Sequence, residues 1–137
     1  MDYRIEAITL PVSDVDRARD FYVQAGWNLD LDTVLGAGFR VVQLTPPGSG
    51  CSITFGTGMP QSEPGSYVNT YLVVSDIEAA HADLKERGIE ISDLFHFSDQ
   101  GQTPGIDPSR GDYGTYATFA DPDGNAWLLQ EVPSRAG

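Results

Sequence analysis

A short sequence pattern occurs twice in this chain, once in each half. Residues 10–16 read Leu-Pro-Val-Ser-Asp-Val-Asp and residues 72–78 read Leu-Val-Val-Ser-Asp-Ile-Glu, so the two copies lie 62 positions apart. Each copy is an apolar run, then a serine, then an acidic residue three positions later. This order is typical of a capping box, in which the serine and the acid bind free amides at a helix start. Each copy therefore predicts a strand that runs into a helix, at Ser13 in the first half and at Ser75 in the second.

The first half predicts a module of order strand, helix and three strands (βαβββ). Apolar residues alternate in the expected strands and recur at helical spacing in the expected helix, which Gly26 ends. The expected elements are a strand at 5–12, a helix at 13–25, and strands at 27–32, 39–44 and 51–55. Residues 5–56 form this first module, and the Gly- and Pro-containing residues 57–66 form a linker.

The second half, residues 67–132, repeats the same order. Its expected elements are a strand at 67–74, a helix at 75–87, an extended stretch at 89–97, and strands at 115–120 and 126–132. The turn at 44–50 corresponds to the turn at 119–125, which is an offset of 75 rather than 62. The second half therefore carries an inserted loop at about 99–114, and such loops either cover the surface or bind ligands. The expected fold class is α+β, with residues 1–137 as a single domain.

Composition and charge exclude several classes of protein. The 137 residues include 20 acidic and 8 basic side chains, for a net charge of −12. This charge would repel nucleic acid, and it serves either solubility or the attraction of a cationic small molecule. No apolar stretch approaches the roughly 18 residues of a membrane span, so we expect a cytoplasmic protein without a membrane partner. The single Cys51 excludes an internal disulfide and a cysteine-rich metal site.

The doubled βαβββ order and the stretch Phe119-Ala120-Asp121-Pro122-Asp123-Gly124-Asn125 together resemble the vicinal oxygen chelate superfamily. That superfamily contains glyoxalase I, bleomycin-resistance proteins, fosfomycin-resistance enzymes and extradiol dioxygenases. The resemblance extends from Ile5 to Val132. It implies curved mixed sheets that form a cup around a ligand, but it does not fix a reaction, because function resides in the site.

The resemblance also implies where metal ligands would stand in this chain. Those four places are occupied by Ala7, Ile53, Asn69 and Leu128. Alanine, isoleucine and leucine have no donor atom, and asparagine is a weak, neutral ligand. We therefore expect no metal centre and no cofactor.

The chain contains two histidines, and one of them is a candidate for chemistry. His81 is expected on an exposed helix face. His96 lies between Phe95 and Phe97 on an extended stretch that leads into the inserted loop. It is expected either to be a rim residue or to contact the ligand and transfer a proton, because the pKa of histidine ordinarily lies near neutrality.

Strand alternation predicts which side chains line the cup. If the four metal-ligand places face inward, so do the residues two positions away on the same strands. The predicted ligand-binding residues are Phe39, Gln43, Ile53, Phe55, Asn69, Tyr71, Tyr116, Leu128 and Gln130. Ser52 and Thr54 are poor core residues, so a slip of one residue in the strand at 51–55 is left open. This mostly apolar and aromatic lining suits an organic, aromatic ligand.

The sequence favours a metal-independent protein of the glyoxalase/bleomycin-resistance type that binds an aromatic natural product or antibiotic. One alternative is an isomerase, lyase or cyclase that uses His96, Tyr116 or Tyr71 to transfer protons. A weaker alternative is a metal-dependent lyase or dioxygenase with relocated ligands. The sequence contains no nucleophile elbow, phosphate-binding loop or dinucleotide-binding fingerprint. We also expect a homodimer, because each half leaves an open sheet edge.

Overall fold

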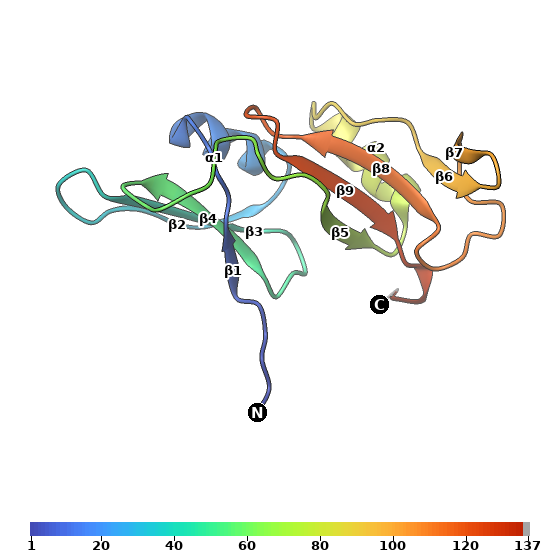
Figure 1. The fold of residues 1–137 in the computed structure, drawn as a ribbon, viewed down its shortest axis with the longest axis horizontal. Coiled ribbons are helices and arrows are strands. Elements are labelled where there is room, and N and C mark those ends of the chain that lie inside the picture. The colour runs from blue at the N-terminus through green and yellow to red at the C-terminus, as the bar shows by residue number, and fades with distance from the viewer. Residues whose placement is uncertain (136–137) are drawn as a thin grey trace. The chain divides into compact units, whose positions relative to one another are not determined.

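The computed structural model describes residues 1–135, which form two mixed β-sheets with one α-helix packed against each (Figure 1). Main-chain contacts divide the chain into two compact units. The first unit comprises residues 1–67 and 121–125, and the second comprises residues 68–120 and the residues from 126 on. Neither helix is long and apolar enough to cross a membrane.

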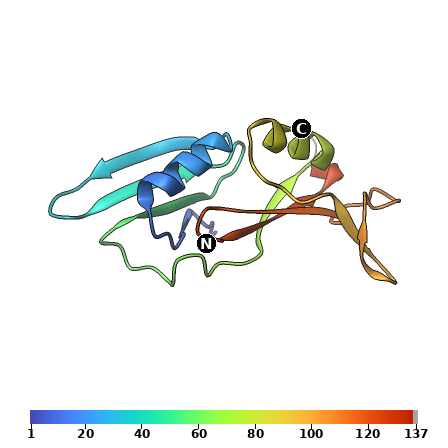
Figure 2. The same cartoon turned by 90° about the horizontal axis from the view of Figure 1, so that it is seen from above.

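The first unit contains a four-stranded sheet. Its elements are β1 (Ala7–Thr9), α1 (Val15–Gln24), β2 (Asn28–Val34), β3 (Arg40–Thr45) and β4 (Ser52–Thr57). The strand order is β1-β4-β3-β2, with β1 parallel to β4 and the other pairs antiparallel. Helix α1 lies along one face of this sheet, as Figure 2 shows from above.

The second unit repeats this arrangement and adds one strand. Its elements are β5 (Thr70–Val74), α2 (Ile77–Glu86), β6 (Phe95–Ser98), β7 (Gly101–Pro104), β8 (Thr115–Ala120) and β9 (Ala126–Glu131), followed by a short 3₁₀ helix (Pro133–Arg135). The strand order is β5-β9-β8-β6-β7, with β5 parallel to β9. The additional strand β7 comes from the predicted insertion and pairs with β6. The predicted α+β fold class, with a βαβββ unit in each half, is confirmed.

The helix starts differ from the prediction. Both helices begin two residues later than expected, and the capping residues are Asp14 and Asp76 rather than the preceding serines. Asp14 accepts a hydrogen bond from the Arg17 amide at 3.1 Å. Ser13 instead donates its hydroxyl to Asp123 at 2.5 Å. The aspartate, rather than the serine, occupies the capping position because its carboxylate is a stronger acceptor for a helix amide than a hydroxyl.

Each sheet has a helix face, which packs against α1 or α2, and an open face on the opposite side. On the first sheet the helix face carries Val42 and Leu44 of β3 and Ile53 and Phe55 of β4, all of them buried. The ring centroids of Phe55 and Tyr22 of α1 lie 6.3 Å apart. On the second sheet the buried helix-face side chains are Ala117, Phe119, Trp127 and Leu129.

The turn at residues 121–125 connects β8 to β9 but packs within the first unit. Tyr22, which is fully buried, donates its hydroxyl to Asp121 at 2.9 Å. The Asn125 amide donates to the carbonyl of Pro11 at 2.8 Å. Gly65 has a φ of +77°, and a Cβ atom there would lie 2.0 Å from the carbonyl oxygen of Asp123. Within the stretch that carries the family resemblance, Asp121 and Asn125 are thus buried, hydrogen-bonded residues of the first unit.

Candidate functional site

The open face of the second sheet brings together four of the predicted site residues. In the strand register Tyr71 pairs with Leu128, and Tyr116 pairs with Gln130. Paired residues on neighbouring strands project from the same face of a sheet. All four side chains therefore share the open face, as the alternation predicted, and their contact with a ligand stays a prediction.

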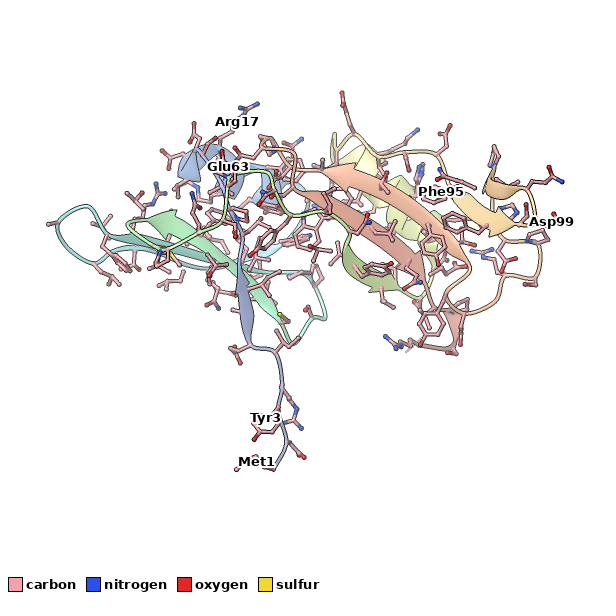
Figure 3. All side chains as sticks on the ribbon, in the orientation of Figure 1. Met1, Tyr3, Arg17, Glu63, Phe95 and Asp99 are labelled. Atoms are coloured by element: carbon pink, nitrogen blue, oxygen red, sulfur yellow. The ribbon has the colours of Figure 1, made fainter. Side chains whose placement is uncertain are left out.

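Two phenylalanines extend this face into an aromatic cluster. The rings of Phe95 and Tyr116 are stacked with centroids 5.7 Å apart. Phe97 contacts both rings edge-on, at 5.9 Å from Phe95 and 5.5 Å from Tyr116. Its side chain is 60% exposed, so an aromatic surface remains open to a ligand. Figure 3 labels Phe95 on β6.

A cavity adjoins the aromatic cluster. Its volume is about 450 Å³, which lies within the range of small-molecule sites. Phe95 and Thr118 belong to the open face, because their register partners are Tyr116 and Leu128. The cavity is lined by Ser92, Asp93, Leu94, Phe95, Gln102, Pro104 and Thr118.

The polar groups of the cluster form a short hydrogen-bond chain. The Tyr116 hydroxyl donates to the backbone carbonyl of Tyr113 at 2.8 Å. Gln130 Nε2 in turn donates to the Tyr116 hydroxyl at 3.3 Å. Tyr113 itself has a φ of +67°, in the left-handed region that non-glycine residues seldom occupy.

His96 does not join these residues. It pairs with Thr115, whose side chain is fully buried on the helix face, and it alternates with Phe95 and Phe97. Its Nδ1 atom lies 2.8 Å from the carbonyl oxygen of Gly105. His96 therefore projects from the face opposite Phe95 and Phe97, because neighbouring residues of β6 point to opposite faces. Its role as a rim residue or as a ligand contact stays a prediction.

The loop after β7 is anchored rather than free. Arg110 donates two hydrogen bonds to Glu131, at 2.7 and 2.9 Å, and forms an ion pair with Glu78 at 3.0 Å. Glu131 also accepts the amide of Ile77 at the start of α2. The Arg110 guanidinium, supported by that amide, holds the pKa of Glu131 below its usual range despite burial. Asp107 binds the Gly111 amide, which lowers the pKa of its own carboxyl.

The strand register of the first sheet corrects part of the predicted lining. Ile53 and Phe55 were expected on the open face, but they pair with Leu44 and Val42 on the helix face. The strand at 51–55 is therefore shifted by one position, and Thr54 takes the open face beside Gln43. The cause is the burial of apolar surface. Packing isoleucine and phenylalanine under α1 stabilises the fold more than packing serine and threonine there would.

Two further predicted residues lie outside the strands of this lining. Phe39 precedes β3 and is partly exposed, with its amide bonded to the carbonyl of Gly36 at 3.0 Å. Asn69 precedes β5 with a φ of +55°, so alternation with Tyr71 does not fix its direction. Asparagine tolerates this left-handed conformation better than most residues. For both residues, contact with a ligand stays a prediction.

Gln43 belongs to a polar group around Asp30. The Asp30 carboxylate accepts hydrogen bonds from Thr45, from Asn28 at 2.6 Å and from Gln43 at 3.4 Å. The Thr45 hydroxyl contributes most to lowering the pKa of Asp30.

A family model matches residues 4–129, and its description is the Glyoxalase/Bleomycin resistance protein/Dioxygenase superfamily. The chain belongs to this superfamily. Solved members of similar structure include TnmS3, described as an antibiotic binding protein from Streptomyces sp. CB03234. TnmS3 is 31% identical, with a TM-score of 0.72 over 96% of this chain and 97% of its own. No curated protein matches the chain.

Two other superfamily members have comparable similarity. A glyoxalase/bleomycin resistance protein from Streptomyces sp. CB03234 is 32% identical, with a TM-score of 0.69 over 93% of this chain and 100% of its own. A member from Sphaerobacter thermophilus DSM 20745 is 29% identical, with a TM-score of 0.70 over 95% of this chain and 98% of its own.

The residues present do not fit the divalent metal found in metal-dependent members of the superfamily. Ala7 and Leu128 lie on open faces without a donor atom, and Ile53 is buried on the helix face. Within residues 1–135 no three His, Cys, Asp or Glu side chains come together in a group that could hold a metal ion.

Proposed function

We propose that this protein binds a planar aromatic small molecule on the open face of its second sheet. The observation that carries this proposal is the aromatic cluster of Phe95, Phe97 and Tyr116 beside a cavity of about 450 Å³. Aromatic rings stack on one another and bury a large apolar area, so an exposed ring surface next to a cavity suits a ligand of the same kind.

The similarity to TnmS3 supports a binding function of this class. TnmS3 is described as an antibiotic binding protein, and this chain matches it over nearly its full length. We therefore propose that the ligand is an aromatic natural product or antibiotic, sequestered rather than transformed.

Binding without turnover is favoured by the state of Tyr116 and His96, two of the three candidate proton-transfer groups. Tyr116 already donates its only hydroxyl proton to the carbonyl of Tyr113. His96 projects from the face opposite Phe95 and Phe97. Neither group is placed to exchange a proton with a ligand on the open face, as an isomerase, lyase or cyclase would require.

A binding titration with a matched pair of variants tests the proposal. We would titrate the protein with polycyclic aromatic antibiotics and follow the quenching of its tryptophan and tyrosine fluorescence. Phe97→Ala should weaken binding by about 10-fold, because it removes an aromatic contact worth about 1.5 kcal/mol. Leu35→Ala removes an equally exposed apolar side chain from a first-unit loop and should leave binding unchanged. Equal effects of both variants would reject the site.

We propose that binding requires no metal ion, since the four ligand places hold Ala7, Ile53, Asn69 and Leu128. Elemental analysis of protein purified without chelator should find less than one bound Zn, Mn, Ni or Fe per chain. The same preparation, incubated with ligand, should return it chemically unchanged by mass spectrometry. A stoichiometric metal that chelation removes together with ligand affinity would contradict this proposal.

We further propose that the protein is a cytoplasmic homodimer. The edge strand β2 carries the exposed side chains of Leu29, Leu31 and Val34. The segment with Met1 and Tyr3 extends beyond β1 with Tyr3 exposed (Figure 3). Exposed apolar edges of this kind are commonly covered by a second copy. Sedimentation equilibrium at micromolar concentration should give twice the mass of the chain, and a monomer mass would refute the dimer.

A further inference from the structure

We propose that Tyr116 acts toward the ligand only as a hydrogen-bond acceptor, so that the site selects aromatic compounds with a phenolic O–H or an amine N–H at the ring edge. This inference rests on the proposed function, because it concerns the same aromatic cluster. It names the class of ligand: hydroxylated or aminated planar aromatics rather than ethers or ketones of the same size.

The direction of the hydrogen-bond chain follows from its fixed end. A backbone carbonyl can only accept, so the Tyr113 carbonyl takes the single hydroxyl proton of Tyr116 at 2.8 Å. Tyr116 can then only accept from its other neighbour. Gln130, at 3.3 Å, must therefore turn its amide N–H toward Tyr116, since its carbonyl oxygen would place two acceptors face to face.

The Tyr113 carbonyl is held in place by the loop and not by any ligand. The Tyr113 amide donates to the carbonyl of Glu131 at 2.8 Å. Arg110, on the same loop, holds the Glu131 carboxylate through two hydrogen bonds. Because the loop is anchored at both points, the Tyr116 proton has a partner before a ligand arrives, and rotating it toward the ligand would break an existing bond.

Two acceptor atoms consequently remain available on the open face. One is the second lone pair of the Tyr116 hydroxyl oxygen. The other is Gln130 Oε1, which has no hydrogen-bond partner within residues 1–135 and is not sealed from solvent. Gln130 still has one unused N–H, so it can accept or donate, whereas Tyr116 can only accept. The discrimination between ligands therefore resides in Tyr116.

A pair of probes in which a methyl group replaces the hydroxyl hydrogen tests this inference. We would measure the affinities of 2-naphthol and 2-methoxynaphthalene, which share a ring system, while only the first can donate a hydrogen bond. The wild-type protein should bind 2-naphthol about 10-fold more tightly, the size of one well-placed hydrogen bond. Tyr116→Phe should remove this preference, and Gln130→Met, which leaves the Tyr116 oxygen free to accept, should keep it.

The outcomes separate the inference from the function on which it rests. If the two probes bind with the same ratio of affinities to wild type and to Tyr116→Phe, the inference is wrong and aromatic binding stands. If Gln130→Met loses the preference while Tyr116→Phe keeps it, the discrimination belongs to Gln130 and the inference is again wrong. If neither probe binds the wild-type protein, both the inference and the proposed aromatic site fail.

Discussion

The guanidinium group of Arg110 donates two hydrogen bonds to the carboxylate of Glu131, with N–O distances of 2.7 and 2.9 Å. The Glu131 side chain is 1% exposed and also accepts the amide of Ile77, the first residue of α2. One buried carboxylate thus ties the loop after β7 to the last strand and to a helix start. A buried charge with these partners is costly to leave unpaired.

Arg110→Ala should lower the free energy of unfolding, because it leaves the buried Glu131 carboxylate without its cation. The loss should be larger at neutral pH than in acid, where protonated Glu131 no longer needs the cation. Urea unfolding at both pH values measures this difference. Arg87→Ala, which breaks a surface pair with Asp83, serves as the control and should cost no more than about 0.5 kcal/mol. A loss for Arg110→Ala that did not depend on pH would contradict the assigned role.

The ion pairs of Asp32 lead us to expect that the first unit loses stability in acid. Hydrogen bonds from Arg40 and then Arg19 lower its pKa from 3.8 to about 2. A lowered pKa means that these contacts stabilise the fold fully above pH 3.8 and lose that effect as the pH falls toward 2. The side chain is 22% exposed, so solvent screening limits the contribution to about 1 kcal/mol.

Comparing the wild-type protein with Asp32→Asn isolates this contribution. The variant should be less stable at pH 7, and the two unfolding free energies should converge as the pH approaches 2. Parallel stability curves between pH 2 and pH 7 would show that the ion pairs of Asp32 do not titrate in this range.

The contribution of the buried Tyr22 hydroxyl to stability can be tested by mutation. Tyr22→Phe removes the 2.9 Å hydrogen bond to Asp121 and should cost about 1–2 kcal/mol, because Asp121 is itself buried. Tyr3→Phe removes a hydroxyl from an exposed side chain and should leave the melting temperature unchanged. Equal melting temperatures for the two variants would mean that the Tyr22 hydroxyl contributes nothing.

Two glycines with positive φ separate steric clash from backbone strain. Gly65→Ala would bring a Cβ atom to 2.0 Å from the Asp123 carbonyl oxygen, whereas Gly36→Ala would meet no atom within 4 Å. Gly36→Ala should therefore cost about 1 kcal/mol from strain alone, and Gly65→Ala more than about 3 kcal/mol. Thermal unfolding of the two variants gives the comparison, and similar losses would argue against close packing at Gly65.

The fold was predictable because its signals are local. Apolar periodicity and the doubled Ser-Asp pattern lie within short windows, and the turn at 121–125 fixes the start of β9. The alternation of Leu128 and Gln130 followed from that start. The capping residues were predicted one position too early, at Ser13 and Ser75 instead of Asp14 and Asp76, because serine and aspartate both suit a helix start.

The candidate site was predicted only in part. Ile53 was placed on the open face by the family resemblance, although burial of Ile53 and Phe55 under α1 is the stronger physical requirement. The aromatic cluster could have been predicted in part from strand alternation. Phe95 and Phe97 flank His96, so on a strand they share one face and His96 lies on the other. The bond between Arg110 and Glu131 could not be predicted, because nothing in either local sequence specifies the other.

The placement of residues 121–125 inside the first unit has a consequence for how the chain reaches its native state. Asn125 binds Pro11 across 114 positions, and Asp121 binds Tyr22 across 99. During synthesis the first βαβββ module therefore emerges long before the turn that completes its core. Contacts of such long sequence separation form late, and they reduce the rate of folding. The module therefore stays incompletely packed until that turn has left the ribosome.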